Sequence, residues 1–371
     1  MVLHIITSLN IGGAEIMLQK LIIERKINGY NDSVICLGCR GDIGDKLQKN
    51  NVNVHYLHIS SSYTLITGFS KLNKLIKFYN PSIIQTWLYH ADLIGGLIGF
   101  LNKIPVIWNI RQTKFNSYKS IFTILIMRLC AGLSYFIPKV IICAAYSSKI
   151  SHSKYGYNKS IFKVIPNGFL VDESPSVEKI KDLKNELLIS DKDIVIGNVG
   201  RFHVDKGYEY FIKAASILSD KYQNLKFIMI GNGLDLNNQE LINWIRFYQL
   251  ENKFILIGKS EIVSEYLKIF DIFCLSSISE GFPNVVGEAM LQSKPCVVTN
   301  SGDSRFIVGD TGLVAKVKDA IDLSDKLIEM IELDSLERIK LGVKAQKRIK
   351  QNFMIDFIVK KYTDTYNEFS K

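Results

Sequence analysis

The chain has 371 residues, of which 47% are hydrophobic, and a net charge of +10. This length exceeds that of one ordinary domain and predicts two α/β domains, each with enough apolar side chains for a core. No run of about 20 apolar residues is free of charge, which argues against a membrane-spanning helix. The apolar start at residues 1–7 lacks the basic residues of a signal peptide and reads as a core strand, so we expect a cytoplasmic protein.

Short apolar runs alternate with helical stretches along both halves of the chain. In the first half we expect strands at residues 2–8, 33–37, 52–57, 83–87, 106–110 and 140–144, with helices at 14–27 and 70–79. In the second half we expect strands at 194–200, 226–230, 254–257, 272–275 and 295–299. Buried strands joined by helical crossovers form parallel sheets that are covered on both faces. The predicted fold class is therefore α/β, with two doubly wound parallel sheets.

The turn-rich residues 165–168 mark the expected boundary between the domains. They end a first domain of residues 1–168, and residues 169–352 form the second. A linker and a lead-in helix are expected over residues 172–188. Residues 353–371 contain an amphipathic helix candidate, and one option for it is to cross back to the first domain.

Charge is distributed unevenly between these halves. Residues 1–168 carry 19 basic and 6 acidic side chains, a net of +13, whereas the remainder carries 27 and 30, a net of −3. Between Asp45 and Asp172 the only acidic residue is Asp92. Such a cationic module seeks nucleic acid, an anionic membrane surface or a phosphorylated acceptor, although a simple lysine-rich solvated surface has the same composition. The chain lacks the signature of a known nucleic-acid module, so we expect no nucleic-acid partner.

The cysteines do not predict a metal site. Four of the six lie in apolar contexts and are typical of core thiols. Cys36 and Cys39 form one Cys-x-x-Cys pair, but no second pair with zinc-like spacing accompanies it.

The segment 279–289 is the most informative part of the sequence. It reads Ser-Glu-Gly-Phe-Pro-Asn-Val-Val-Gly-Glu-Ala and sets Glu280 and Glu288 eight positions apart. Pro283 prevents a helix through Glu280 but suits a first helical turn, which predicts a strand, a loop, and a helix from Pro283 or Asn284. The N–H groups at such a helix start favour a phosphate, and neighbouring carboxylates suit the hydroxyls of ribose and a sugar. A solvated helix start, where acids are common, is the alternative.

Small, cationic or hydrogen-bonding loops follow the strands at the edge where open α/β sheets bind ligands. Arg201 and Lys206 share one loop and could converge on a diphosphate, since Arg offers a fork of donors and Lys a point charge; loop solvation is the alternative. Further loop residues in the second half are Gly200, Gly231, Lys259 and Ile262, and the first strand is followed by Asn10, Gly12 and Gly13. The glycine pair permits close backbone approach, but it does not match the dinucleotide or Walker patterns.

His90 follows a predicted strand and is a candidate site residue, although a lone histidine beside aromatics is more often packed in a core. Asp92 could orient His90 or cap the next helix. Arg111 follows the next strand and could meet an acceptor phosphate or sugar. The aromatic-rich stretch 115–137 favours a buried helix pair slightly, and the alternative is a helix at the membrane interface.

Together these residues resemble the retaining, nucleotide-sugar-dependent GT-B glycosyltransferases of the large group 1 family, typified by bacterial polysaccharide and lipid glycosyltransferases. The likeness spans nearly the whole chain and has its most specific part in the Glu-x7-Glu segment. The matching pieces are Gly12-Gly13-Ala14-Glu15, Trp87-Leu88-Tyr89-His90-Ala91-Asp92, Ile165-Pro166-Asn167-Gly168, Val199-Gly200-Arg201 with Lys206-Gly207, and Glu280-x7-Glu288. The resemblance implies the GT-B fold, in which two Rossmann-like domains face a cleft.

The resemblance also implies roles for the candidate residues. Glu288 would hold the ribose hydroxyls, and Glu280 would hold the donor sugar near the reacting carbon. The catalytic set would be His90, Glu280, Arg201 and Lys206. The donor-binding set would be Gly12, Gly13, Gly200, Arg201, Lys206, Gly231, Lys259, Ile262, Glu280, Phe282, Pro283, Asn284, Val285 and Glu288. The acceptor-binding set would be Asn10 and Arg111.

The family implies retention of configuration through same-face attack, with the leaving phosphate taking the acceptor's proton. Charge develops on the diphosphate in the transition state, where fixed cations and helix N-termini can stabilise it, so we expect no metal and no cofactor. Metal-dependent transferases use an Asp-x-Asp pair. Asp191 and Asp193 have that spacing, but they precede a strand and so lie at the wrong end of the sheet.

The expected partners are a nucleotide-sugar donor, with UDP preferred over GDP or ADP, and a polyprenyl-diphosphate-linked acceptor. The cationic first domain suggests peripheral association with the inner face of the cytoplasmic membrane, in synthesis of lipopolysaccharide O-antigen or capsule. Two alternatives remain open: a non-catalytic RNA- or membrane-binding module, and a GT-B enzyme with a soluble acceptor.

Overall fold

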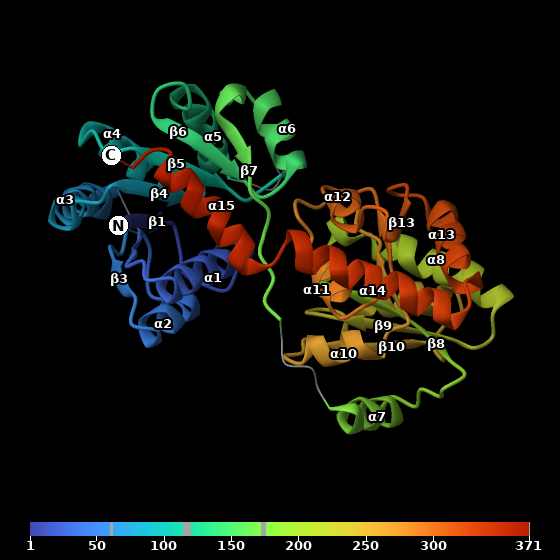
Figure 1. Cartoon of the computed structure of the whole chain (residues 1–371). Coiled ribbons are helices and arrows are strands. Elements are labelled where there is room, and N and C mark those ends of the chain that lie inside the picture. Colours follow the sequence, from blue (N-terminus) through green and yellow to red (C-terminus); the bar gives the residue numbers. More distant parts are fainter. Residues whose placement is uncertain (60–61, 114–119, 172–175, 371) are drawn as a thin grey trace. The chain divides into compact units, whose positions relative to one another are not determined.

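The structure is a computed structural model that describes residues 1–59, 62–113, 120–171 and 176–370. It contains two compact units (Figure 1). Unit 1 joins Met1–Gly168 to Met354–Lys371, and unit 2 spans Phe169–Phe353. The end of the chain therefore belongs to the same unit as its beginning.

Unit 1 is built on a seven-stranded parallel sheet with the order β3-β2-β1-β4-β5-β6-β7. Its strands are β1 (Val2–Ile6), β2 (Ser33–Cys36), β3 (Asn53–Tyr56), β4 (Ile83–Trp87), β5 (Val106–Ile110), β6 (Pro138–Cys143) and β7 (Phe162–Val164). Its helices are α1 (Gly13–Ile27), α2 (Asp42–Lys49), α3 (Ser62–Tyr79), α4 (Tyr89–Leu101), α5 (Ile121–Leu133), α6 (Tyr146–Lys154) and α15 (Ile355–Asn367), with the short 3-10 turn η1 (Lys159–Ile161). The strand order reverses between β1 and β4, which is where ligands bind in doubly wound sheets.

The last helix, α15, completes the core of unit 1. It packs against α1, and its residues Ile358, Tyr362 and Tyr366 are buried among side chains from β1, β4 and α1. Asn109 on β5 donates to the Tyr362 hydroxyl at 3.0 Å, and the Tyr366 hydroxyl donates to Gln85 on β4. These polar contacts fix the position of α15 on unit 1.

Unit 2 is built on a six-stranded parallel sheet with the order β10-β9-β8-β11-β12-β13. Its strands are β8 (Ile194–Val199), β9 (Leu225–Ile230), β10 (Phe254–Gly258), β11 (Ile272–Leu275), β12 (Cys296–Thr299) and β13 (Gly312–Ala315). Its helices are α7 (Val177–Glu186), η2 (Val204–Lys206), α8 (Tyr208–Lys221), α9 (Gln239–Phe247), α10 (Val263–Ile269), α11 (Asn284–Leu291), α12 (Ser304–Val308), α13 (Ala320–Glu332) and α14 (Ser335–Asn352). The strand order reverses between β8 and β11.

The predicted fold class is confirmed: both units are doubly wound parallel sheets. Two strands were not anticipated, β7 and β13, because each is a short edge strand without a long apolar run. The expectation of a buried helix pair over 115–137 is wrong for the part described: residues from 121 on form the one helix α5, half exposed, and residues 114–119 lie outside the described part. Residues 172–175 of the predicted linker also lie outside the part of the chain that the structure describes.

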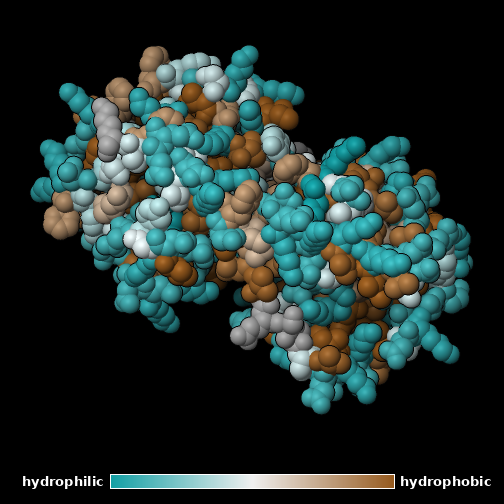
Figure 2. All heavy atoms as spheres, viewed as in Figure 1, coloured by the Kyte–Doolittle hydropathy of each residue, from teal (hydrophilic) through white to brown (hydrophobic). Residues whose placement is uncertain are grey.

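The surface carries mainly hydrophilic side chains with hydrophobic ones among them, as Figure 2 shows for one face. None of the described helices is both long and apolar enough to cross a bilayer.

Candidate active site

The loop after β8 and the loop after β11 bring two predicted site residues into contact. The Lys206 ammonium lies 2.7 Å from Oε1 of Glu280, and the Ser277 hydroxyl donates to the same oxygen at 2.6 Å. Only 21% of the Lys206 side chain and 12% of the Glu280 side chain are exposed. A cation and a carboxylate are thus held together at the carboxyl edge of the sheet of unit 2.

Hydrogen bonds between these two loops fix their spacing. Asn198 on β8 donates to the Ser276 hydroxyl at 3.2 Å, and Ser276 donates to the Lys206 carbonyl at 2.9 Å. The Ile278 amide donates to the Asp205 carbonyl at 2.7 Å. Both Asn198 and Ser276 are buried, so this polar chain is shielded from water.

Two glycines allow the loops to approach this closely. Gly207 has a φ of 62°, and a Cβ there would lie 2.4 Å from the Ser276 carbonyl oxygen. Gly302, on the loop after β12, has a φ of 57°, and a Cβ there would lie 2.5 Å from the carbonyl oxygen of Glu280. Any larger residue would both strain the backbone and push the loops apart.

The loops after β9 and β10 join the same edge. A Cβ on Gly231 would lie 2.0 Å from the Gly200 carbonyl oxygen, and the Gly231 amide donates to the Gly258 carbonyl at 2.8 Å. Lys259 and Ile262, which follow β10, are exposed at the rim. The candidate residues of the four loops therefore lie along one continuous edge of unit 2.

The helix with the second carboxylate begins where the sequence predicts. Pro283 is the N-cap residue of α11, so the backbone amides of Asn284 and Val285 open the helix and Glu288 lies on its second turn. Gly287 is explained by packing, because a Cβ there would lie 2.1 Å from the ring of Phe169. The sequence alone gave no account of this glycine.

The ring of Phe282 belongs to an aromatic cluster. It lies 6.2 Å from the ring of Phe169 and 5.9 Å from that of Phe353, between centroids, and Phe282 is buried. Its ring therefore anchors the Glu-x7-Glu loop, and only its backbone remains for a donor.

Arg201 differs from Lys206 in its surroundings. Its side chain is exposed, and its guanidinium has no ion pair or hydrogen bond within the part of the chain that the structure describes. Its backbone is held, since the Tyr208 hydroxyl donates to the Arg201 carbonyl at 3.3 Å. Burial raises the pKa of Tyr208, and the nearby charge of Glu280 raises it further, so this hydroxyl stays protonated.

In unit 1, His90 follows a strained turn at the carboxyl end of β4. Leu88 has φ 72° and ψ 155°, a region that residues other than glycine rarely adopt. This turn places Tyr89 and His90 in the first turn of α4, and the His90 ring lies 6.4 Å from that of Phe122 on α5. Backbone strain of this kind is typical of functional sites, which supports the choice of His90.

Asp92 does not cap α4, so that alternative is wrong. The N-cap residue is Leu88, and Asp92 is buried within the first turn, where it accepts a hydrogen bond from the Thr86 hydroxyl at 2.5 Å. Burial raises the pKa of Asp92 well above its usual range despite that hydrogen bond. The hydrogen bond from Thr86 joins the end of β4 to the first turn of α4.

The other predicted residues of unit 1 are more varied. A Cβ on Gly12 would lie 2.4 Å from Oε2 of Glu15, whereas one on Gly13 would meet nothing within 4 Å, so only Gly13 borders open space. Asn10 is exposed. The Arg111 guanidinium donates to the Asn167 side chain and, at 3.3 Å, to the hydroxyl of Tyr362. Arg111 thus ties β5 to α15, and its predicted contact with an acceptor stays a prediction.

Sequence reasoning missed Ser276, Ser277 and Thr299. The Thr299 hydroxyl at the end of β12 donates to the Ser277 carbonyl at 2.6 Å. One feature of the sequence could have predicted the role of the two serines: Ser276 and Ser277 lie directly after a predicted strand and shortly before Glu280.

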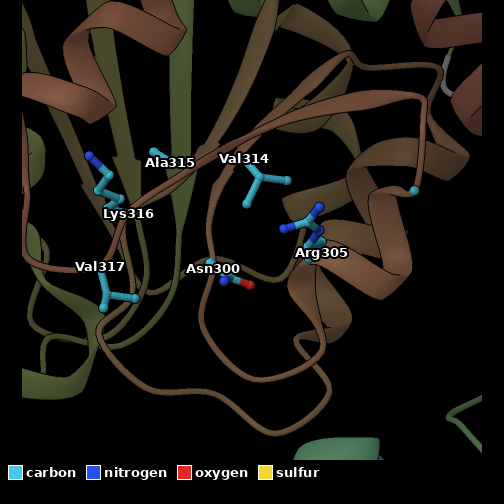
Figure 3. Close-up of a pocket in the computed structure, with 7 residues that line it drawn as sticks. Asn300, Arg305, Val314, Ala315, Lys316 and Val317 are labelled. Carbon is cyan, nitrogen blue, oxygen red and sulfur yellow. The ribbon is translucent and has the colours of Figure 1, made fainter.

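A separate hollow of about 450 Å³ lies beside α12, lined by Asn300, Arg305, Gly309, Val314, Ala315, Lys316 and Val317. Figure 3 shows Arg305 and Lys316 on opposite sides of Val314, so the two cations do not converge on one anion. Among residues 1–59, 62–113, 120–171 and 176–370, no group of three or more His, Cys, Asp or Glu side chains is arranged to hold a metal ion.

Two doubly wound units with glycine-rich and charged loops at their carboxyl edges define the GT-B class of transferases. The family model described as Glycosyl transferases group 1 matches residues 179–352, and that described as Glycosyltransferase Family 4 matches residues 11–173. The chain belongs to the group 1 glycosyltransferases with the GT-B fold.

Individual relatives agree with this assignment. The chain is 26% identical to the capsular polysaccharide biosynthesis glycosyltransferase CapM of Staphylococcus aureus, over 87% of each chain. It is 25% identical to the N,N'-diacetylbacillosaminyl-diphospho-undecaprenol alpha-1,3-N-acetylgalactosaminyltransferase of Campylobacter jejuni, over 97% of each chain. Its fold is similar to that of Anabaena HepE in complex with UDP, with a TM-score of 0.86 and 21% identity over 99% of each chain.

Proposed function

We propose that this glycosyltransferase moves a sugar from a nucleotide sugar, with UDP as the nucleotide, to a lipid-linked saccharide, and that it retains the anomeric configuration. The product would enter a bacterial surface polysaccharide such as O-antigen or capsule. The names of the Staphylococcus and Campylobacter relatives support the polysaccharide and the diphospho-undecaprenol acceptor, and the UDP held by HepE supports the nucleotide.

The contact of Lys206 with Glu280 and Ser277 carries the proposal. A mostly buried ammonium needs a counter-charge, and Glu280 supplies it at 2.7 Å in the structure. When a donor binds, its diphosphate would become the partner of Lys206, and Glu280 would turn to the hydroxyls of the donor sugar. Lys206 would thus contact the diphosphate and Glu280 the sugar, which lie on either side of the bond that breaks.

The remaining cationic groups would act on the leaving diphosphate. The exposed Arg201 has a fork of donors that suits phosphate oxygens, and the backbone amides of Asn284 and Val285 open the N-terminus of α11. The amides of α11 are fixed before the reaction, and the Arg201 side chain would join them when it binds the phosphate, so negative charge would be stabilised as it develops on the diphosphate. The proposal gives this task to the protein's own cations, without a metal ion.

The other candidate residues would position the substrates. Glu288 would accept hydrogen bonds from the ribose hydroxyls, and the base would lie against the loop 258–262. His90 would contact the donor sugar near the transferred bond. The acceptor hydroxyl would attack from the face that the nucleotide leaves, and its proton would pass to the departing phosphate oxygen.

The acceptor side of the proposal rests on unit 1. Residues 1–168 carry a net charge of +13, which suits both a diphosphate-bearing acceptor and the anionic inner face of the cytoplasmic membrane. We therefore propose peripheral membrane association with an electrostatic component. The fraction bound to anionic vesicles should fall as salt rises, and a bound fraction that ignores salt would contradict this component.

A screen for nucleotide release tests the central proposal. The protein is incubated with a panel of UDP-, GDP- and ADP-sugars, with and without a polyprenyl-diphosphate saccharide. We expect acceptor-dependent release of UDP, and a product whose anomeric linkage, read by NMR, matches that of the donor. No release from any nucleotide sugar, together with salt-sensitive binding of RNA, would favour the non-catalytic alternative.

The metal-free mechanism has its own test. Activity should persist after dialysis against EDTA because the proposed charge stabilisation comes from Arg201, Lys206 and α11. A loss of activity in EDTA that magnesium restores would overturn this part of the proposal and leave the transferase assignment intact.

A further inference from the structure

One side of α5 and of the turn after it presents large apolar side chains to solvent. Ile121, Phe122, Leu125, Leu129 and Phe136 recur at helical spacing and are 87%, 66%, 60%, 49% and 74% exposed. We call these five residues the α5 face. The opposite side of the helix is buried in the core of unit 1, so α5 lies flat on the unit with this face outward. Contiguous exposed apolar surface of this kind marks an interaction site.

The charges around the α5 face are of one sign. Arg128 lies within it, and Lys103 and Lys139 lie near the end that Phe136 occupies. None of these three side chains has an ion pair or hydrogen bond among the residues that the structure places. From residue 46 to residue 171 the only acidic residue is Asp92, which is fully buried. An anionic partner is therefore complementary to this surface.

The α5 face continues into an apolar hollow. Phe136 borders a space of about 690 Å³ at the amino ends of β5 and β6, and both lysines lie on its wall. The hollow is lined by Pro81, Ser82, Phe100, Leu101, Lys103, Ile104, Pro105, Val106, Phe136, Ile137 and Lys139. A mainly apolar space with two ammonium groups fits a lipid whose chain enters it and whose headgroup is anionic.

The surface that matches these properties is an anionic bilayer. A helix that lies flat, with large apolar residues on one side and only basic residues around them, is typical of proteins that bind at the membrane interface. A protein partner would have a polar rim around its apolar contact, and that rim would need acidic side chains to match this surface. Here the rim is basic, as the headgroups of anionic lipids require.

The α5 face also begins beside a candidate catalytic residue. Phe122 lies in the first turn of α5, and its ring lies 6.4 Å from the ring of His90. We propose that the α5 face docks on an anionic bilayer and thereby holds His90 at the level of the lipid headgroups. The sugar would then be added close to the lipid diphosphate, to an acceptor that is still short. This inference rests on the proposed lipid-linked acceptor.

Binding to vesicles tests the docking surface. Phe136→Glu places a charge in the α5 face, and Phe247→Glu is the control, since Phe247 on α9 of unit 2 is an equally exposed phenylalanine at 78%. With vesicles of phosphatidylglycerol and phosphatidylcholine, we expect the bound fraction to fall about tenfold for Phe136→Glu and not for Phe247→Glu. Equal binding of Phe136→Glu and the wild type would overturn the inference; Leu125→Glu repeats the test if Phe136→Glu does not fold.

Quenching by brominated lipids tests the level of His90. In Phe122→Trp a tryptophan stands beside His90, and Phe247→Trp again serves as the control. When brominated phosphatidylcholine replaces ordinary phosphatidylcholine in vesicles with phosphatidylglycerol, the fractional loss of fluorescence should be larger for Phe122→Trp than for the wild type. For Phe247→Trp it should not be larger. An unquenched Phe122→Trp on vesicles that bind it would show that His90 stands away from the bilayer.

Activity separates this inference from the proposed function. Phe136→Glu should transfer sugar to a water-soluble, short-chain diphosphate acceptor as fast as the wild type, and about tenfold more slowly to the same saccharide on a vesicle-bound polyprenyl chain. Equal losses on both acceptors would contradict docking by the α5 face. If the wild type transfers sugar to neither acceptor, the proposed function fails, and the binding and quenching results still decide whether the α5 face docks.

Discussion

The two units share a fold but place their polar groups differently. In unit 2 the hydrogen bonds of Asn198, Ser276 and Ser277 lie at the carboxyl edge, where they join the loops that carry Lys206 and Glu280. In unit 1 the buried ion pair of Arg25 and Asp32 lies by the amino end of β1, and the α5 face exposes apolar side chains with lysines nearby. The contrast indicates that a rigid polar edge suits the binding of a small charged ligand. A basic and apolar exterior suits contact with an extended partner such as an anionic membrane.

The largest effect among the tests of this contrast is expected from removing the buried ion pair between Arg25 and Asp32 in unit 1. Arg25 Nε lies 2.5 Å from Oδ2 of Asp32, and both side chains are almost fully buried. Burial alone would raise the pKa of Asp32, but the neighbouring His4 ring, whose Nε2 lies 3.8 Å from Oδ2, and the hydrogen bonds from Arg25 outweigh burial and hold it well below the usual range. Arg25→Met leaves a buried carboxylate without its partner, so we expect a loss of about 3–5 kcal/mol in the free energy of unfolding of unit 1.

Urea denaturation followed by circular dichroism measures this loss. The double variant Arg25→Met, Asp32→Asn is the control, because it removes both charges and should recover part of the stability. A loss below about 1 kcal/mol for Arg25→Met would show that the ion pair is not a centre of stability.

The next largest effect is expected at the polar edge of unit 2. Lys206→Met removes one of the cations proposed to stabilise the leaving diphosphate, and the expected fall in kcat is about 100- to 1,000-fold. Lys213→Met, on the exposed side of α8, is the matched control and should leave kcat unchanged. A kcat within threefold of the wild type would remove Lys206 from the mechanism.

A half-buried lysine in unit 2 gives a stability test with a defined pH dependence. Burial lowers the pKa of Lys294 from 10.5 to about 8, and its ammonium donates to the Lys268 carbonyl at 2.7 Å. Below pH 8 the lysine is charged in both states, and its burial costs the folded state up to about 3 kcal/mol. Lys294→Met should therefore stabilise the protein at neutral pH. The gain in the free energy of unfolding is reduced by the loss of the hydrogen bond to the Lys268 carbonyl.

This gain should shrink in alkaline solution. Between pH 8 and pH 10.5 the folded protein loses the Lys294 proton while the unfolded chain still holds it, so wild-type stability rises relative to that of Lys294→Met. Denaturation curves on both sides of this window measure the difference, with the exposed Lys340→Met as the control. A difference that does not change with pH would contradict the lowered pKa.

The smallest expected effect concerns the affinity for the donor. Glu288→Ala should weaken nucleotide-sugar binding by about 1.5–3 kcal/mol, the loss of hydrogen bonds to a charged group. Isothermal titration calorimetry measures it, and Glu251→Ala, on the exposed turn before β10, should bind as the wild type does. Unchanged donor affinity in Glu288→Ala would exclude the proposed contact of Glu288 with the ribose. The carboxylates proposed to bind the donor at this edge would then be reduced to Glu280.

The sequence predicted the fold well because its signals are local. Apolar runs set β4, β5 and β11 at the residues where the structure has them, and Pro283 set the start of α11. The edge strands β7 and β13 escaped notice because three or four residues of ordinary composition carry no periodic signal. Their pairing depends on neighbouring strands that are distant in sequence.

The contacts of the candidate site were less predictable than its loops. A parallel sheet collects the loops at one edge, so their residues could be named in advance. The ion pair between Lys206 and Glu280 joins residues 74 positions apart, and the bond from Ser277 depends on the turn that the loop takes. Arg111 shows the same limit, because its partner Tyr362 lies 251 positions away in the sequence. Tyr362 is on α15, and the sequence did not determine which domain this helix packs against.

The position of α15 has a consequence for how the protein is made. Unit 2 is one continuous stretch of chain, but the core of unit 1 includes Ile358, Tyr362 and Tyr366 from α15, which follows unit 2 in the sequence. All residues of unit 2 are therefore synthesised before unit 1 receives α15. A released chain truncated before residue 354 should therefore present protease with an unfinished unit 1 joined to a resistant unit 2.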